Sequence, residues 1–285
     1  MHSRIPIWQH LGTVLGSIVK HLLMLAMTVA ILWPLYFMIT SAFKLKMEYL
    51  NNKLGLPIQP VLDNFHHIFF QLAFPQWFIN SVILTAGSLL VTAVFASLAA
   101  YAFSQMRFAG RDLLFDIIVA LMVIPPVVMV IPVFSVMTHL RLVDTYPAPI
   151  ITYTGLMLPF SIYLLRNFFK TIPKPIIESA KIDGCTDWMV LLRIILPLST
   201  PALVTLLLVN ALWVWNELLI ALILLQSEKM RSLMVGLTLI KGRFTVNQPL
   251  IMAGMLSAAL PMLILYLFGQ RYLVKSLAAG AVTGE

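Results

Sequence analysis

The chain has 285 residues, of which 60% are hydrophobic and only 11% are charged, and its mean hydropathy is +0.94. Soluble domains carry about 25% charged residues, so this composition excludes a protein whose whole surface faces water and indicates one that faces lipid. The 19 Lys and Arg against 11 Asp and Glu give a net charge of +8, which cationic loops beside anionic lipid head groups explain without nucleic acid. The single cysteine, Cys185, excludes an internal disulfide and metal sites built on several thiolates.

Long stretches without charged residues predict membrane-spanning helices, because about 20 apolar residues cross the hydrocarbon core. Six such helices are expected, at about 21–43, 78–103, 113–138, 146–168, 201–225 and 251–269. The third is expected to be kinked by its prolines, and the fifth to continue as one helix with Glu217 inside it. The first apolar run is too long for a cleaved signal peptide. The sequence therefore predicts an all-α integral membrane protein with one transmembrane domain over residues 1–285.

An even number of spans places both termini on the same side of the membrane. The loop over residues 166–193 lies on that side and carries five Lys and Arg residues, and the side as a whole carries 11 of the 19. Cytoplasmic loops are enriched in Lys and Arg. We therefore expect both termini, and the loop between spans four and five, to be cytoplasmic.

The segment 171–198 between spans four and five predicts a compact pair of helices. Pro175 suits the first position of a helix and Gly184 suits the position just past its end, which gives a helix of about nine residues. Glu178 lies in its first turn, where the helix dipole favours an anion. A second helical stretch is expected from Thr186, stopped by Pro197. The alternative is an amphipathic helix that rests on the lipid surface.

This segment also resembles the "EAA" loop of ABC-importer permeases, in which a coupling helix docks into a groove on the ATPase subunit. The matching residues are Glu178, Ser179, Ala180, Asp183 and Gly184, followed by Pro197. Ser179 replaces the usual second alanine and Cys185 the alanine after the glycine, both with small side chains. Further matches lie at Asn80-Ser81, 99–103, Ile124-Pro-Pro126, Trp215-Asn-Glu217 and Gln270-Arg-Tyr272. Together they are similar to the maltose-type carbohydrate permeases, specifically the shorter six-span partner.

The resemblance implies a permease subunit in the bacterial cytoplasmic membrane that imports a sugar or oligosaccharide. It implies a second permease subunit, two ATPase subunits and an extracytoplasmic solute-binding protein as partners. ATP and magnesium would be bound by the ATPase, since this chain has no G-x-x-x-x-G-K-[ST] motif, and no cofactor, enzymatic activity or nucleic-acid partner is expected here. The tail from Ser276 is either a disordered end or, as in the family, an insert between the ATPase subunits.

Polar residues and prolines inside the apolar stretches predict the translocation path: Asn80, Pro125, Pro126, Trp215, Asn216 and Glu217. A charge at the centre of a span costs about 2.5–3.5 kcal/mol on insertion scales, so such residues usually face a polar interior. Prolines free backbone carbonyls, which are tolerated beside protein or a water-filled cavity. The alternatives are an interfacial position for Glu217 and simple packing for the prolines. No metal site is expected.

Two other classes of function stay open at this point. A free-standing ion-coupled transporter would need ion-binding residues within its spans and often carries inverted repeats, whereas this chain offers one intramembrane glutamate. A membrane-embedded enzyme would need a cluster of catalytic groups, and no such cluster is visible in the sequence.

Overall fold

The computed structural model describes residues 7–240 and 247–281, with side chains described over 16–240 and 247–271. Every regular element within these residues is a helix, as the sequence predicts. The chain divides into two units. One runs to Gln71 and includes the segment that ends at Ser257, and the other covers Leu72–Ile240 and the segment from Ala258. Four of the described helices could cross a membrane, or up to six elements if each of two bent helix pairs counts as one span.

The first unit begins with the longest helix, α1 (Ile7–Ala42), followed by α2 (Lys46–Asn51) and α3 (Asp63–Gln71). The stretch Gly16–Ala42 has a mean hydropathy of 2.2, and none of its most apolar window is buried inside the chain. A helix that is apolar on every side is suited to a lipid environment.

The turn after α1 is organised by a buried lysine. The Nζ of Lys44 donates to the carbonyl oxygens of Asn52 at 2.8 Å and Gly55 at 2.6 Å. The Nδ2 of Asn64 on α3 donates to the carbonyls of Ala42 at 2.9 Å and Lys44 at 2.8 Å. A buried ammonium group needs such partners to offset its lost hydration. The loop that follows α1 is therefore folded around Lys44.

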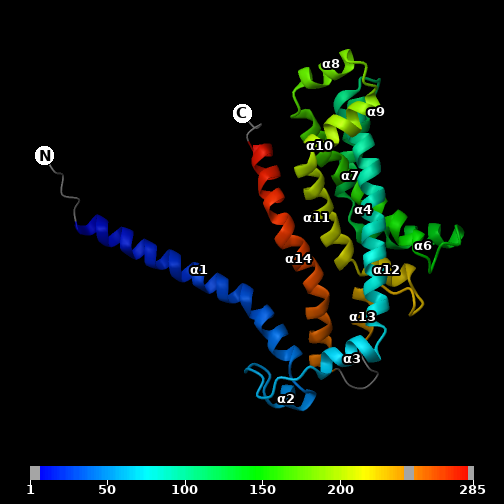
Figure 1. Cartoon of the computed structure of the whole chain (residues 1–285). Helices are drawn as coiled ribbons and strands as arrows, with labels where there is room; N and C mark the ends of the chain where they lie inside the picture. Colours follow the sequence, from blue (N-terminus) through cyan, green and yellow to red (C-terminus); the bar gives the residue numbers. More distant parts are fainter. Residues whose placement is uncertain (1–6, 241–246, 282–285) are drawn as a thin grey trace. The chain divides into compact units, whose positions relative to one another are not determined.

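The second unit is built on three helices that pack side by side, α4 (Phe74–Gln105), α7 (Pro147–Lys170) and α11 (Thr200–Asn216), as Figure 1 shows. Small residues let these helices approach closely, as is common between membrane helices. A Cβ added to Gly87 on α4 would lie 2.8 Å from the Cδ1 of Ile150 on α7. Helices α4 and α7 overlap the predicted ranges 78–103 and 146–168.

Between α4 and α7 the chain forms two short helical arms. The first consists of α5 (Arg111–Ala120) and η1 (Leu121–Val123), and the second of η2 (Pro126–Met129) and α6 (Val130–His139). The arms meet at 92°, so the expectation of one kinked helix over 113–138 is wrong. Ile124 and Pro125 both adopt extended backbone conformations, because each precedes a proline, whose ring disfavours the helical region for the residue before it.

The helical region that follows Thr186 also differs from the sequence prediction. It comprises α9 (Asp187–Val190), η3 (Leu191–Ile195) and α10 (Leu196–Leu198), so Pro197 does not stop it. The η3 segment is a π-helix, and such a widened turn accommodates a proline that would otherwise clash with the preceding turn. The bend of 77° comes just after it, before α11.

The fifth predicted span is interrupted. Helix α11 ends at Asn216, Glu217 has an extended backbone with ψ of 127°, and a separate helix, α12 (Leu219–Leu224), follows. The expectation of one helix over 201–225 is therefore wrong. Helix α13 (Leu233–Leu239) then packs against α4, at the end of α4 opposite to helix α8 (Lys174–Ile182) in Figure 1.

The last helix, α14 (Gln248–Ala281), extends past the predicted range 251–269 and belongs to both units. Within the second unit it packs tightly on α11, since a Cβ on Gly269 would lie 2.2 Å from the Cδ1 of Leu208. The backbone is helical through the first residues of the tail that begins at Ser276. Residues 282–285 of that tail lie outside the described residues.

Candidate functional site

Helix α8 is the central element of the segment 171–198, and both of its ends follow from local sequence. It begins at Lys174, with Pro175 in the first turn. After its last residue, Gly184 adopts φ of +84°. The N–H of Cys185 donates to the carbonyl of Ala180 at 3.0 Å, and the N–H of Gly184 to that of Lys181 at 3.1 Å. These bonds form a Schellman motif, which satisfies the free carbonyls at a helix end. The nine-residue helix predicted from the sequence is confirmed.

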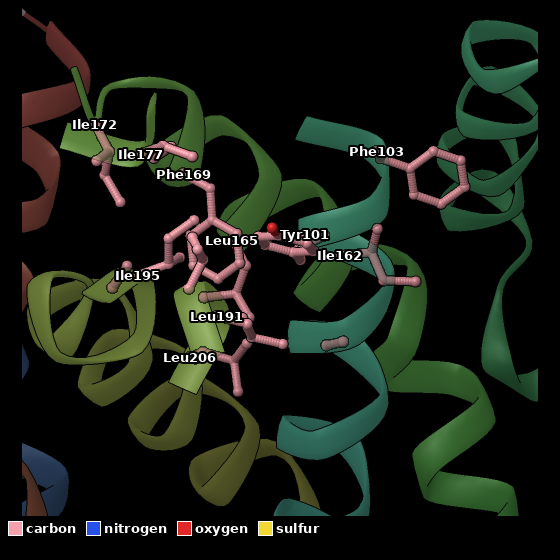
Figure 2. Close-up of a cluster of buried hydrophobic side chains, with 14 of the residues drawn as sticks. Tyr101, Phe103, Ile162, Leu165, Phe169, Ile172, Ile177, Leu191, Ile195 and Leu206 are labelled. Carbon is pink, nitrogen blue, oxygen red and sulfur yellow. The ribbon is translucent and has the colours of Figure 1, made fainter. Parts of the chain in front are cut away.

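One face of α8 is anchored in the protein's own core. Ile177 and Ala180 are buried, three residues apart and hence on the same side of the helix. They join a hydrophobic cluster with Leu165 of α7, Leu191 of η3 and others, shown in Figure 2. The small side chain of Ala180 therefore allows α8 to pack on its own subunit.

The opposite face of α8 is open. Glu178, Ser179 and Asp183 are all exposed. Large apolar side chains accompany them, with Ile182 86% exposed and Trp188 of α9 57% exposed. A surface that combines exposed large apolar residues with polar ones is typical of a protein or membrane contact. The predicted coupling residues thus divide between an inward anchor at Ala180 and an outward surface.

A carboxylate that the sequence analysis missed ties this segment to α4. The hydroxyl of Tyr101, near the end of α4, donates to the Oδ1 of Asp187 at 2.7 Å. The Nζ of Lys181 on α8 lies 2.8 Å from the same oxygen. The Lys181 and Asp187 side chains are 47% and 48% exposed, so their ion pair contributes about 0–1 kcal/mol. The Tyr101 bond is worth more, about 1.5–3 kcal/mol, because it pairs a buried tyrosine with a charged acceptor.

The predicted path residue Asn80 lies at the other end of α4, and its side chain is fully buried. Its Nδ2 donates to the carbonyls of Lys229 and Arg231, both at 2.8 Å. Its Oδ1 accepts from the hydroxyl of Tyr146 at 2.7 Å and from the Nε2 of Gln76 at 2.9 Å. Within this chain Asn80 thus holds the turn between α12 and α13 against α4 and α7.

Trp215 is also buried. Its Nε1 donates to the carbonyl of Ala258 on α14 at 3.0 Å, and its ring meets that of Phe78 edge to face at 5.5 Å. Asn216 differs from both, because it is exposed and its Nδ2 donates only to the carbonyl of Leu212 one turn earlier at 2.7 Å. Of these three predicted path residues, only Asn216 has an open surface within this chain.

Glu217 stands at the break between α11 and α12. Its Oε1 accepts from the N–H of Ile220 at 2.9 Å, and its Oε2 from the N–H of Ala221 at 3.0 Å and from the hydroxyl of Tyr153 at 2.7 Å. The first N–H groups of a helix lack partners within the helix, and a side-chain oxygen that accepts from them stabilises the helix start. The glutamate therefore caps α12 and joins it to α7.

Pro125 and Pro126 are exposed at the junction of the two helical arms. Beside them lies a pocket of about 250 Å³, lined by Leu121, Met122, Ile124, Pro126, Met129, Gly155, Leu156, Pro159 and Phe160. All of these side chains are apolar, and a Cβ at Gly155 would meet no other atom within 4 Å. The pocket can accept an apolar group but offers no side-chain hydrogen bond to a sugar.

Comparison with known proteins places these features in a family. Residues 92–277 match the family model described as "Binding-protein-dependent transport system inner membrane component". An ABC transporter permease protein, ORF2, of Caldicellulosiruptor sp. (strain Rt8B.4) is 39% identical over 252 residues, which cover 88% of this chain and 91% of that protein. The arabinooligosaccharides transport system permease protein AraQ of Halalkalibacterium halodurans is 31% identical over 256 residues, with 88% and 91% covered.

A solved structure has a similar fold. It is that of a bacterial ABC transporter involved in the import of the acidic polysaccharide alginate, with a TM-score of 0.83 and 24% sequence identity. The match covers 92% of this chain and 97% of the other. The all-helical fold described above is therefore similar to the fold of that ABC-transporter chain.

Proposed function

Because the chain belongs to the family of binding-protein-dependent transport system inner membrane components, we propose that it is the permease subunit through which an ATP-driven importer moves a sugar or oligosaccharide. It is a multi-pass inner-membrane protein, and the family describes the membrane component of the transport system. The sugar class rests on the relative named for arabino-oligosaccharide transport. ATP hydrolysis belongs to a separate subunit.

The observation that carries this proposal is the construction of α8. A helix that receives force from an ATPase must keep its shape and must be fixed to the helices that move. Helix α8 has a Schellman motif at its end, an inward face packed in the core through Ile177 and Ala180, and an outward face with Ile182 exposed. We therefore assign the outward surface of α8, with Glu178, Ser179 and Trp188, to contact with the ATPase.

Co-purification tests the assembly directly. A tagged copy of this chain, extracted from its native membrane in mild detergent, should bring with it a second permease subunit and an ATPase. In proteoliposomes, the assembled complex should take up sugar only with ATP and the solute-binding protein. Sugar uptake by the purified chain alone, driven by a proton gradient, would instead establish the ion-coupled alternative.

The structure favours the importer over that alternative at Glu217. An ion-coupled transporter needs its intramembrane carboxylate to exchange a proton or to bind a cation. Both oxygens of Glu217 already accept hydrogen bonds, from Tyr153 and from two N–H groups of α12. The cap accounts for a carboxylate within this apolar stretch without ion transport.

We place the translocation path along the side of α11 that exposes Asn216, next to Glu217, with the bent arms at Pro125 and Pro126 as a second part of its wall. The single substitutions Asn216→Cys and Trp215→Cys, the second at a buried position, test this in a Cys185→Ser background. The thiol at position 216 should react with a water-soluble reagent in at least one transport state, and sugar should slow the reaction. Protection of the thiol at position 216 in every state would remove that position from the path. Reaction of the thiol at position 215, which is buried in this structure, would show that α11 separates from its neighbours in some transport state.

We also propose that both termini and α8 lie on the cytoplasmic side. The loop 166–193 carries five Lys and Arg residues, as expected for that side. Reporter fusions at Glu285 and within 226–232 should give opposite orientations.

A further inference from the structure

Asp187 joins three elements through a single atom. Its Oδ1 accepts from the hydroxyl of Tyr101 on α4 at 2.7 Å and lies 2.8 Å from the Nζ of Lys181 on α8. Asp187 itself is the first residue of α9. Helices α8, α9 and α4 therefore meet at one carboxylate oxygen, although Tyr101 and Asp187 are 86 residues apart in the sequence.

The two sides of this junction differ in burial. Tyr101 is 5% exposed and its ring lies in the cluster of Figure 2, where it is held among Leu165, Phe169 and Leu191. Lys181 and Asp187 are both about half exposed. The tyrosine thus lies within the core on a long helix, and the carboxylate lies at the surface of the segment that carries α8.

The apolar anchor of α8 reaches the same end of α4. Ile177 and Ala180 belong to a cluster that includes residues from one end of α4, at Ala96, Ala99, Ala100, Tyr101 and Phe103. Apolar contacts are not directional and tolerate sliding, whereas a hydrogen bond to a carboxylate has a short length and a preferred angle. The hydrogen bond therefore adds a directional link to this apolar contact, so that a displacement of α8 pulls α4 rather than sliding past it.

We propose that Asp187 is a positioning residue for energy coupling: through Tyr101 it transmits the displacement of α8 to α4, and Lys181 keeps the carboxylate aligned. This inference rests on the proposed function, since it takes α8 as the element that the ATPase moves. It adds the route by which the movement reaches the helix core. The other end of α4 holds the turn between α12 and α13 through Asn80, so this route extends along the whole helix.

Tyr101→Phe is the primary variant, because it removes the hydroxyl and keeps the buried ring. The control is Tyr163→Phe, whose ring on α7 is 42% exposed and whose hydroxyl has no hydrogen bond among the described residues. Both variants are made in the assembled complex. The readouts are the amount of ATPase that co-purifies and the sugar transported per ATP hydrolysed.

We expect Tyr101→Phe and Asp187→Ala to retain the ATPase, because neither residue is among those assigned to the ATPase contact. Both variants should transport less sugar per ATP, by about threefold or more. Losing a hydrogen bond to a charged group shifts the equilibrium between coupled and uncoupled positions of α4 by about tenfold or more. The double variant should be no worse than Asp187→Ala, because both changes remove one interaction. Tyr163→Phe should match the wild type.

A wild-type ratio of sugar to ATP in Tyr101→Phe would overturn the inference, as would additive losses in the double variant. Loss of ATPase binding without a change in that ratio would also overturn it, because the bond would then serve assembly alone. The proposed function fails differently: in that case no ATPase co-purifies with the wild-type chain.

Discussion

Replacement of Gly184 by alanine tests how the end of α8 is formed. Gly184 has φ of +84°, in the left-handed region, where a residue with a Cβ costs about 1–2 kcal/mol. The added Cβ would meet no atom within 4 Å, so no steric penalty adds to this cost. The free energy of opening the Schellman motif should fall by that amount, which corresponds to about a 5–30-fold larger population of the open form.

Hydrogen exchange of the amides of Gly184 and Cys185 in nanodiscs measures this opening. Gly184→Ala should exchange about 5–30-fold faster than wild type, by the same conversion. Gly184→Asn should fall between them, because asparagine tolerates the left-handed region better than alanine does. Gly184→Phe should exchange like Gly184→Ala, since the space around the Cβ is open in this chain.

The comparison of alanine with phenylalanine separates the backbone from the partner. If Gly184→Phe loses more ATPase on purification than Gly184→Ala does, the extra loss reports a surface that approaches Gly184 in the complex. Wild-type exchange in Gly184→Ala would refute the assignment of the Schellman motif. Much faster exchange in Gly184→Phe than in Gly184→Ala would refute the open space around this residue.

Three further predictions concern the opposite end of the second unit. Glu217→Ala should destabilise the start of α12 by about 0.5–2 kcal/mol through loss of its cap, seen as faster hydrogen exchange at Ile220 and Ala221. Glu217→Gln keeps one acceptor oxygen and should lose less of this stability. Equal exchange rates in wild type and both variants would contradict the cap. Asn80→Ala should cost about 1–3 kcal/mol, because it removes the buried amide that donates to the carbonyls of Lys229 and Arg231, and should speed exchange in residues 228–232 but not in α8. Burial raises the pKa of Asp144, but hydrogen bonds from the Ser227 N–H and hydroxyl and from the Gln226 N–H outweigh this effect and hold that pKa below its usual value. The ionised Asp144 carboxylate therefore stabilises the folded protein above about pH 4, and this stabilisation is lost as the pH falls through the lowered pKa. The melting temperature of wild type should therefore exceed that of Asp144→Asn at pH 6, and the difference should shrink towards pH 3.

The helices that sequence analysis predicts well are those whose ends are set by neighbouring residues. Pro175 and Gly184 determine α8 because a proline start and a glycine end act through the local backbone. The long apolar stretches of α4 and α7 are equally plain in the sequence, since span length alone identifies them.

The errors arise where distant residues decide the structure. At the break between α11 and α12, Glu217 accepts a hydrogen bond from Tyr153, 64 residues away in the sequence. In the sequence alone, a charged residue within an apolar stretch gives the same pattern whether it caps a helix or lines a path. Asp187 was missed because its partner Tyr101 lies 86 residues earlier. The available signal was an aspartate at the start of a helix together with a tyrosine near the end of an apolar one.

Pro197 shows a different limit. A proline normally ends a helix or kinks it, yet here the helical region continues to Leu198 because a π-helix precedes it. The change of direction falls at Ser199, whose N–H still donates to the carbonyls of Ile195 and Leu196. Proline position alone therefore identified the neighbourhood of the bend but not its place.

The central claim is that the outward face of α8 contacts the ATPase while its inward face does not. A photo-crosslinking residue at position 182, where Ile182 is 86% exposed, compared with one at position 177, where Ile177 is 5% exposed, tests this in intact membranes. We expect position 182 to form a crosslink to the ATPase subunit and position 177 to form none. A crosslink from position 177, or none from position 182 in a complex that transports sugar, would contradict the account.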